Sequence, residues 1–375
     1  MPFGAARLTQ ALSTSSAQAT KDDLRQRMQT TFSGLAKRFP QLAKQANSAE
    51  GIHIYFCGGG FRGYGSMLMH TDPIQPYPVS SIGGYTVPGN RFIKWREMLH
   101  ANNYEDGKIF GMSKRRREQF PAIVAVVQAL IEAVPKIIKV TFCSGGNREG
   151  VLYMKLPKAI RESHPVPLFP SGSLTQDAGS IDAVTDLLLA ALPENAPLAI
   201  SKEILHYVAR NIWQDQGEAE DTNSARAIHA PTSGALAGLP GINHETRAIL
   251  ALTLCARWGA DLGSADAKVR DNLRDLVGRE LAWWCDYVGT VSRLLSTIMP
   301  VCPPNGEQLV RMLQLTAHTS HGLGKKGHKV GIQLSVKVVQ SARRGLSTGA
   351  LEEFFSKVGK GTHQGWKVEA EIDDL

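Results

Sequence analysis

Apolar residues recur with two different periods along the chain, and the pattern changes near residues 163 and 300. Short apolar runs of strand type occupy residues 52–55, 137–141 and 151–154. Helical spacing occurs between and before them, over residues 22–45 and 123–134. Strands that alternate with helices are typical of an α/β domain, which we expect to end near Ser163.

A different organisation is predicted after that point. Residues 164–180 are expected to form a linker, because residues 164–173 hold three prolines and two serines flanking a glycine. Residues 181–300 are almost entirely helical by pattern and predict an all-α domain. Residues 301–375 are expected to form a small α+β segment, with strands at 330–339 and 366–372 and a helix at 349–357.

Composition places the chain among globular proteins, since 43% of its 375 residues are hydrophobic and 20% are charged. The formal net charge of +8 suits an acidic ligand such as a phosphate chain or a nucleotide. The basic residues are spread along the chain, so nucleic acid is not specially favoured. The longest apolar stretch, residues 122–134, is too short to span a bilayer.

The five cysteines form no C-x-x-C pair, and their odd number argues against a disulfide framework. Cys57 and Cys143 each end an apolar strand, where free cysteine usually behaves as a small hydrophobe. We therefore expect a reducing compartment.

One motif occurs twice, as residues 56–62 (Phe-Cys-Gly-Gly-Gly-Phe-Arg) and 142–148 (Phe-Cys-Ser-Gly-Gly-Asn-Arg). Glycines bring backbone N–H groups close to a ligand, and arginine offers a two-pronged fork for phosphate. The alternative is a pair of tight turns without a ligand, because short glycine motifs have many false positives. The predicted phosphate-binding residues are Gly58, Gly59, Gly60 and Arg62.

The second turn is a structural or binding candidate, with Gly145, Gly146, Asn147, Arg148 and Glu149. We expect Arg148 and Glu149 to form a buried structural ion pair rather than a catalytic pair. Glu149 could act as a general base only beside a bound water, which the sequence does not indicate.

Three further features have ordinary explanations. The basic run Lys114–Arg117 could hold a polyanion or serve as a nuclear address, but a solvated helix start is favoured. The pair Trp283 and Trp284 indicates helical core rather than a platform for base stacking. Three histidines lie among Gly and Lys without a carboxylate or Cys partner, which predicts a loop and not a metal site: His318, His321 and His328.

Together, residues 111–121 and 142–150 resemble the exopolyphosphatase/guanosine pentaphosphatase (Ppx/GppA) family, and most of all its fungal regulators of mitochondria-to-nucleus retrograde signalling. The family's glycine-rich phosphate loop is matched by residues 57–62. Residues 117–120 match an E-R-A-D-like segment, and residues 147–150 match the closing L-R-E-G turn. The resemblance implies an actin-like (RNase H-like) fold for the α/β domain.

The helical half resembles the fungal C-terminal region, through residues 223–229, 238–245 and 247–259 with the tryptophan pair. That region is similar to the HD-type helical domain of bacterial relatives. His229 and His244 both lack a following Asp, so we expect no HD metal site.

The chain departs from the family pattern at its start. The D-x-G-S loop, the catalytic Glu and the G-G-G-S-T loop have no match, and residues 2–9 resemble the segment that follows them. We therefore expect the chain to begin inside the second actin-like lobe, without the first lobe. Phe61 stands where bacterial members carry a small hydroxyl residue. The composition of residues 1–21 is similar to a mitochondrial transit peptide, but the family match explains residues 2–9 better.

These departures leave no residue to assign to catalysis, so whether the chain is an enzyme stays open at this point. No cofactor is expected here, although the complete family fold can take Mg²⁺. The favoured function is a regulatory protein that senses phosphate, polyphosphate or a nucleotide in the cytoplasm, with the nucleus as the alternative. Its helical half would contact protein partners, and the chain could form a homo-oligomer. The alternatives are a phosphohydrolase acting on polyphosphate or guanosine pentaphosphate, and a fragment that folds poorly.

Overall fold

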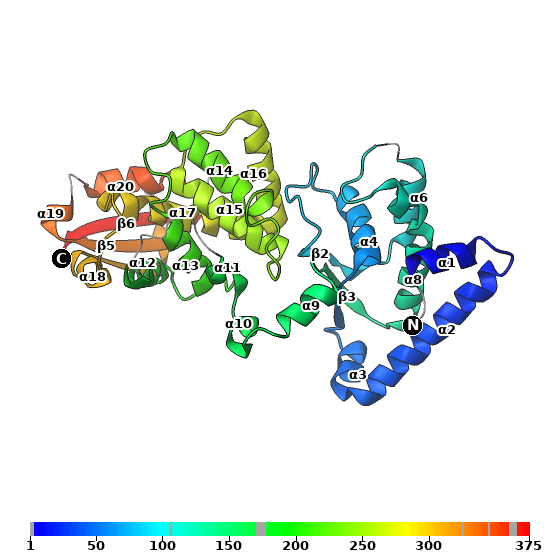
Figure 1. Ribbon diagram of the computed structural model, residues 1–375. Helices are drawn as coiled ribbons and strands as arrows, with labels where there is room; N and C mark the ends of the chain where they lie inside the picture. The colour runs from blue at the N-terminus through cyan, green and yellow to red at the C-terminus, as the bar shows by residue number, and fades with distance from the viewer. Residues whose placement is uncertain (1–3, 106, 170–177, 325, 344–345, 360–365) are drawn as a thin grey trace. The chain divides into compact units, whose positions relative to one another are not determined.

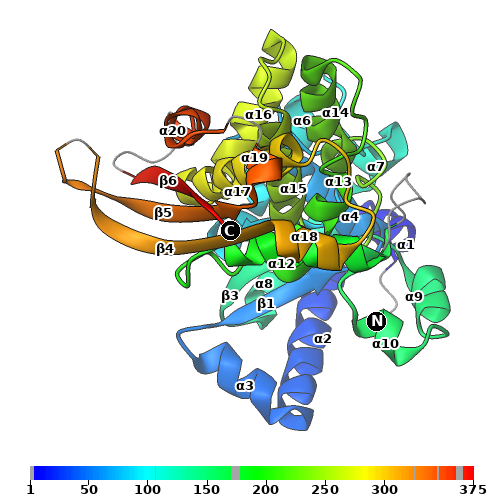
Figure 2. The ribbon, with the colours of Figure 1, turned by 90° about the vertical axis from the view of Figure 1, so that its left-hand side faces the viewer.

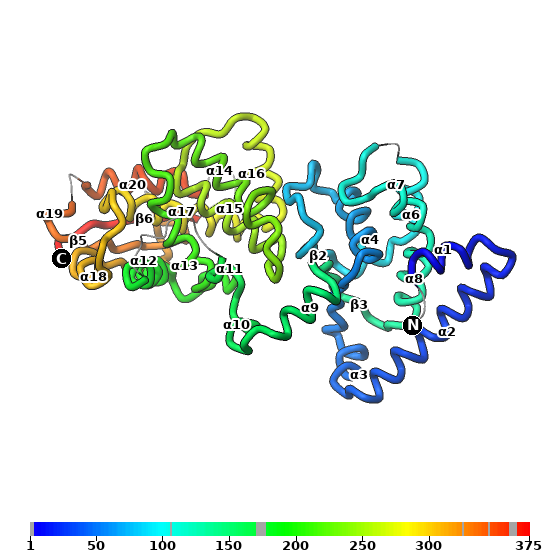
Figure 3. The backbone as a smooth tube through the Cα atoms, in the orientation of Figure 1, coloured from blue at the N-terminus to red at the C-terminus, as the bar shows by residue number. Residues whose placement is uncertain are grey.

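The computed structural model describes residues 4–375 except 106, 170–177, 325, 344–345 and 360–365. The chain divides into two compact units. The first contains the residues up to Ser163 together with Pro240–His244, and the second contains His164–Leu239 and Glu245–Leu375. Figure 1 draws both units with their elements labelled, and Figure 3 traces the same backbone.

The first unit is built on a three-stranded sheet of order β1-β3-β2. β1 runs parallel to β3, with Phe56 opposite Phe142, and β2 runs antiparallel to β3. The strands are β1 (Ile52–Phe56), β2 (Tyr85–Pro88) and β3 (Ile137–Phe142). The helices are α1 (Ala5–Leu12), α2 (Ala17–Arg38), α3 (Pro40–Asn47), α4 (Gly59–His70), α5 (Gly89–Phe92), α6 (Trp95–Tyr104), α7 (Lys114–Glu118), α8 (Phe120–Ala133), α9 (Asn147–Tyr153) and α10 (Lys158–Glu162).

Helix α8 joins two parts of this core, which explains why it is apolar on two sides. Phe120, Ile123 and Val127 lie in the same buried cluster as the sheet residues Val140 and Phe142. The other side of α8 carries small residues and packs against both α1 and α2. That second cluster contains Ala122, Ala125, Ala129 and Ala133 with Leu8, Leu24 and Met28. Small side chains let the helices approach closely, so α1 is held against the sheet layer through α8.

Helix α4 also comes very near the sheet. A Cβ atom built on Gly65 would lie 2.7 Å from Cγ of Phe142 in β3, and Phe142 is fully buried. Only glycine allows this separation without a shift of the helix. The approach sets the position of the first turn of α4, where the predicted phosphate loop lies.

The second unit combines a helical layer with a three-stranded sheet of order β4-β5-β6. Figure 2 shows the three strands of this sheet next to one another. β4 pairs antiparallel with β5, and β5 pairs parallel with β6. The strands are β4 (Leu313–Leu323), β5 (Lys329–Val338) and β6 (Trp366–Asp374). The helices are α11 (Pro165–Leu168), α12 (Ala178–Ala190), α13 (Lys202–Asn211), α14 (Glu220–Thr232), α15 (His244–Trp258), α16 (Ser264–Val277), α17 (Arg279–Ile298), α18 (Gly306–Met312), α19 (Gln340–Arg343) and α20 (Thr348–Phe355).

Aromatic residues fill the core of the second unit. Trp283 and Trp284 of α17 are 1% and 0% exposed. The ring of Trp366, at the start of β6, lies edge-on to both indoles, with centroid separations of 5.0 and 5.8 Å. The predicted core role of the tryptophan pair is therefore confirmed. Across the described residues, none of the helices has the length and apolarity to cross a membrane.

The mixed α/β character predicted from the sequence is confirmed, but three local predictions are wrong. The helix expected over residues 22–45 is divided, because α2 ends at Arg38 and α3 begins with Pro40. Residues 151–154, expected as a strand, lie in α9 and just after it. His318 and His321, expected in a loop, belong to β4, while His328 precedes β5.

Candidate functional site

The two copies of the repeated motif meet at one edge of the first sheet. β1 and β3 are parallel neighbours that end level with each other, so both glycine turns emerge at the carboxyl ends of the strands. The first turn leads into α4 and the second into α9. Arg62 joins them, because its Nη1 donates a hydrogen bond of 2.6 Å to the carbonyl oxygen of Gly145. The structure thus brings the two predicted turns together.

The first turn has the backbone geometry of an anion-binding loop. Gly58 is the N-cap of α4 and has a φ of +104°, which favours glycine strongly. The N–H groups of the first helical turn have no partner within the helix and carry the positive end of its dipole. Nothing lies within 4 Å of a Cβ atom built on Gly58 or Gly59, so a ligand can approach the backbone there.

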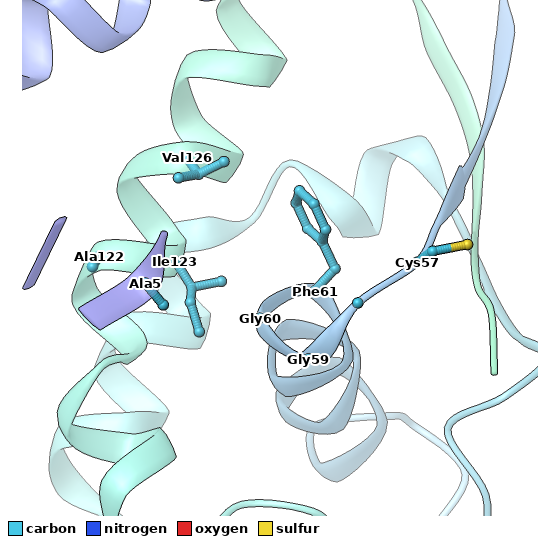
Figure 4. A pocket seen from close by; sticks show the side chains of 9 residues that line it. Ala5, Cys57, Gly59, Gly60, Phe61, Ala122, Ile123 and Val126 are labelled. Atoms are coloured by element: carbon cyan, nitrogen blue, oxygen red, sulfur yellow. The ribbon is translucent and has the colours of Figure 1, made fainter. Parts of the chain in front are cut away.

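A cavity of about 250 Å³ lies beside this turn. Its lining contains Cys57, Gly58, Gly59, Gly60 and Phe61 on one side and Ala5, Ala122, Ile123 and Val126 on the other (Figure 4). The second set comes from α1 and α8, and sequence reasoning did not find it. Ligand cavities usually measure about 300–1,000 Å³, so this cavity is small, and apart from the glycine turn and Cys57 its lining is apolar.

The Phe61 side chain packs against the hydrophobic core of the first unit. Its ring stacks on Phe56 with a centroid separation of 4.1 Å and an interplanar angle of 16°. Figure 4 shows the ring extending toward Val126, beyond the first turn of α4. The Phe61 ring therefore narrows the apolar side of the cavity.

Only part of the hydrogen-bonding capacity of the Arg62 guanidinium is used within the protein. The side chain is half-buried, and in the described part of the chain the bond to Gly145 is its one hydrogen bond. The remaining guanidinium N–H groups can meet an anion at the mouth of both turns.

The second turn offers fewer donors than the first. The Gly146 N–H donates to Oε2 of Glu149 at 2.8 Å, so this carboxylate already occupies one backbone amide. Arg148 and Glu149 are both exposed, which makes the predicted buried ion pair wrong. The reason is that α9 runs away from the sheet edge, with no buried residue along its length.

Sequence reasoning also missed the relation between Cys57 and Cys143. They follow the paired residues Phe56 and Phe142, and the Cys143 N–H donates to the carbonyl oxygen of Phe56 at 2.7 Å. Burial, and then the neighbouring Cys57, raise the pKa of the Cys143 thiol to about 11. The available signal was that both cysteines hold the same position in the repeated motif.

The remaining candidates lie elsewhere. The basic run forms α7, whose N-cap Ser113 accepts from the Arg116 N–H, and its side chains are largely exposed, so the predicted solvated helix start is confirmed. His229 of α14 contacts Asp266 of α16 at 2.7 Å. Within the described ranges, no group of three or more His, Cys, Asp or Glu residues is arranged to hold a metal ion.

The sequence profile of the Ppx/GppA phosphatase family matches residues 1–159, and that of the RTG2 C-terminal domain matches residues 167–374, more than half of the chain. This chain belongs to the family defined by the RTG2 C-terminal domain, which here follows a segment that matches the Ppx/GppA phosphatase family. The predicted family is confirmed. The phosphate-loop candidates lie in the Ppx/GppA part, and the tryptophan core lies in the RTG2 part.

The chain is also similar in sequence to a yeast protein. Retrograde regulation protein 2 of Saccharomyces cerevisiae is 28% identical over 316 residues, which cover 80% of this chain and 53% of the relative. The chain therefore spans about half the length of this yeast relative.

Proposed function

We propose that this chain is a regulatory protein of the retrograde-regulation type that senses a phosphate group, on polyphosphate or a nucleotide, at Gly58–Arg62. The observation that carries the proposal is the Arg62 bridge, which holds two glycine turns side by side and leaves part of its own fork for an anion. The Ppx/GppA match and the similarity to the yeast retrograde regulation protein support it.

The proposed architecture follows the family. We assign residues 1–163 to the second actin-like lobe, 164–180 to a linker, 181–300 to an HD-like helical domain without its metal pair, and 301–375 to a small α+β segment. The parallel β1–β3 pair with its glycine turns supports the first assignment. We further propose that the helical half contacts regulatory protein partners.

Binding without appreciable hydrolysis is the expected chemistry. Hydrolysis of a phosphoanhydride needs a positioned general base and charge stabilisation around the transferring group. The Glu149 carboxylate is exposed and already accepts the Gly146 N–H, so it lacks the enclosed surroundings that would tune it as a general base. The Ppx/GppA match favours a phosphohydrolase as the second candidate, with Mg²⁺ in the complete fold.

A ligand titration with a matched pair of variants tests the binding site. Arg62→Ala removes the fork at the turns. Arg116→Ala removes a guanidinium that makes a similar single bond, to the Gly111 carbonyl oxygen at 2.7 Å, but on exposed α7. We expect short polyphosphate and ATP to bind weakly, near a millimolar dissociation constant or about 4 kcal/mol, because the site contacts the ligand from one side.

Nuclear magnetic resonance should show the amides of Gly58, Gly59 and Gly60 shifting with ligand. The shifts should be lost in Arg62→Ala, reduced in Arg62→Lys and kept in Arg116→Ala, because only a planar fork can hold both a carbonyl and an anion. If these glycine amide signals do not move at several millimolar ligand while signals elsewhere shift, the phosphate site is refuted. Phosphate release by the wild type that Arg62→Ala abolishes would favour the phosphohydrolase.

A further inference from the structure

Cys57 and Cys143 lie side by side at the ends of two adjacent parallel strands. The register pairs Phe56 with Phe142, so the cysteines that follow are also neighbours. Adjacent strands are about 4.8 Å apart, which falls inside the Cα separation of about 4.4–6.8 Å found in disulfides. The Cys57 thiol is also close enough to the Cys143 thiol to raise its pKa.

The two cysteines differ in accessibility. Cys57 is exposed and Cys143 is half-buried, whereas Cys255 and Cys285 of the second unit are buried and Cys302 is half-buried. Figure 4 shows the Cys57 sulfur directed away from Phe61. A small reagent can therefore reach Cys57 first.

We propose that Cys57 and Cys143 form a reversible disulfide by exchange with a small-molecule disulfide, which makes this sheet edge a redox modification site. The proposal does not depend on whether the neighbouring turns bind phosphate. It requires only two neighbouring thiols, one accessible sulfur and an oxidant of the glutathione-disulfide class.

The reaction balances in two exchange steps. The Cys57 thiolate attacks one sulfur of the small disulfide, and the displaced small thiolate takes up the proton that Cys57 lost. Cys143 then loses its proton and attacks the Cys57 sulfur, which releases a second small thiol. Two protein thiols are oxidised, and one small disulfide is reduced to two thiols.

Cys143 suits the second step. Burial, and then the neighbouring Cys57, raise the pKa of the Cys143 thiol to about 11, so it is a poor attacking thiol toward an external disulfide. Once Cys57 is joined to the small thiol, the charge of the Cys57 thiolate is gone. Cys143 then becomes easier to ionise, next to the sulfur that it attacks.

The bond would add a second tie between the two turns. Cys57 directly precedes Gly58, the N-cap of α4, and Cys143 lies two residues before Gly145, the carbonyl that Arg62 holds. Oxidation would therefore restrict both strand ends, and reduction would release them.

The full chain treated with oxidised glutathione under native conditions tests the proposal by peptide mass mapping. The wild type should yield a Cys57–Cys143 linked peptide that dithiothreitol removes. In Cys143→Ser the reaction should stop at a glutathione adduct on Cys57. Cys57→Ser should react with oxidised glutathione at about a tenth of the wild-type rate or below. Cys302→Ser is the control and should form the link normally. A glutathione adduct on wild-type Cys57 without any linked peptide would overturn the proposal.

Phenylarsine oxide gives a second measurement without oxidation, because trivalent arsenic bridges two neighbouring thiols. The wild type should bind it about once per chain in the first unit, resistant to a monothiol and removed by a dithiol. Cys57→Ser and Cys143→Ala should both lose this binding, while Cys302→Ser keeps it. Equal binding by all four proteins would contradict the pairing.

Discussion

Gly65→Ala should destabilise the first unit by forcing α4 away from β3. The added methyl group would lie 2.7, 2.9 and 3.0 Å from three ring atoms of Phe142. Carbon atoms pack best at about 3.5–4.0 Å, so the helix and strand have to separate by about 1 Å. The ring cannot turn aside easily, because it is fully buried.

The expected magnitude is the difference of two terms. Overpacking a core costs about 1–3 kcal/mol. Alanine is better than glycine inside a helix by about 1 kcal/mol. We therefore expect Gly65→Ala to lower the free energy of unfolding by up to about 2 kcal/mol. Gly34→Ala is the matched control, since Gly34 is exposed in α2 with no atom within 4 Å of an added Cβ, and it should gain about 0.5–1 kcal/mol.

Hydrogen exchange of the β3 amides is the suitable assay. Five of the six tryptophans lie in the second unit, so fluorescence would report mainly on that unit. Under conditions where exchange follows the opening equilibrium, the β3 amides should exchange faster in Gly65→Ala, by a factor of up to about 30. They should exchange more slowly in Gly34→Ala, while β5 stays unchanged in both. Slower β3 exchange in Gly65→Ala would refute the close-packing argument.

Two further predictions concern pH and association. Burial lowers the pKa of His206 from its ordinary value of 6.5, so the unfolded chain takes up the proton first and the second unit should lose stability as pH falls below 6.5. His206→Gln should flatten that part of the thermal-stability profile between about pH 7.5 and 5.5, and an unchanged slope would contradict this. Exposed apolar side chains on and after α9, among them Leu152 and Met154 at 69% and 68%, should promote self-association. Leu152→Asp should raise the monomer fraction in sedimentation while Leu198→Asp in the second unit should not, and a wild type that is already monomeric would exclude the effect.

The strands that end in glycine turns were predictable, and so was the core position of the tryptophan pair. β1 and β3 are compact apolar runs with a clear stop, and Trp283 and Trp284 continue a helical pattern. Residues 151–154 misled because four apolar residues fit a strand as well as a helix. The helix prevails because Glu149 caps its start through the Gly146 N–H.

Only part of the candidate site could be predicted from the sequence. The motif indicated the glycine turns and Arg62, but the wall formed by Ala5 and Val126 depends on how α1 and α8 pack. The neighbouring positions of Cys57 and Cys143 required β1 to lie next to β3, with β2 on the far side. Strand order of this kind depends on tertiary packing and is not encoded in local periodicity.

The position of β6 in its sheet has a consequence for synthesis on the ribosome. β6 covers β5 along nine register pairs and brings Trp366 against Trp283 and Trp284. The sheet and the tryptophan core of the second unit thus stay unfinished until residues 366–374 have emerged. A nascent chain interrupted earlier would present the bare edge of β5, a template for wrong pairing that chaperones would have to shield.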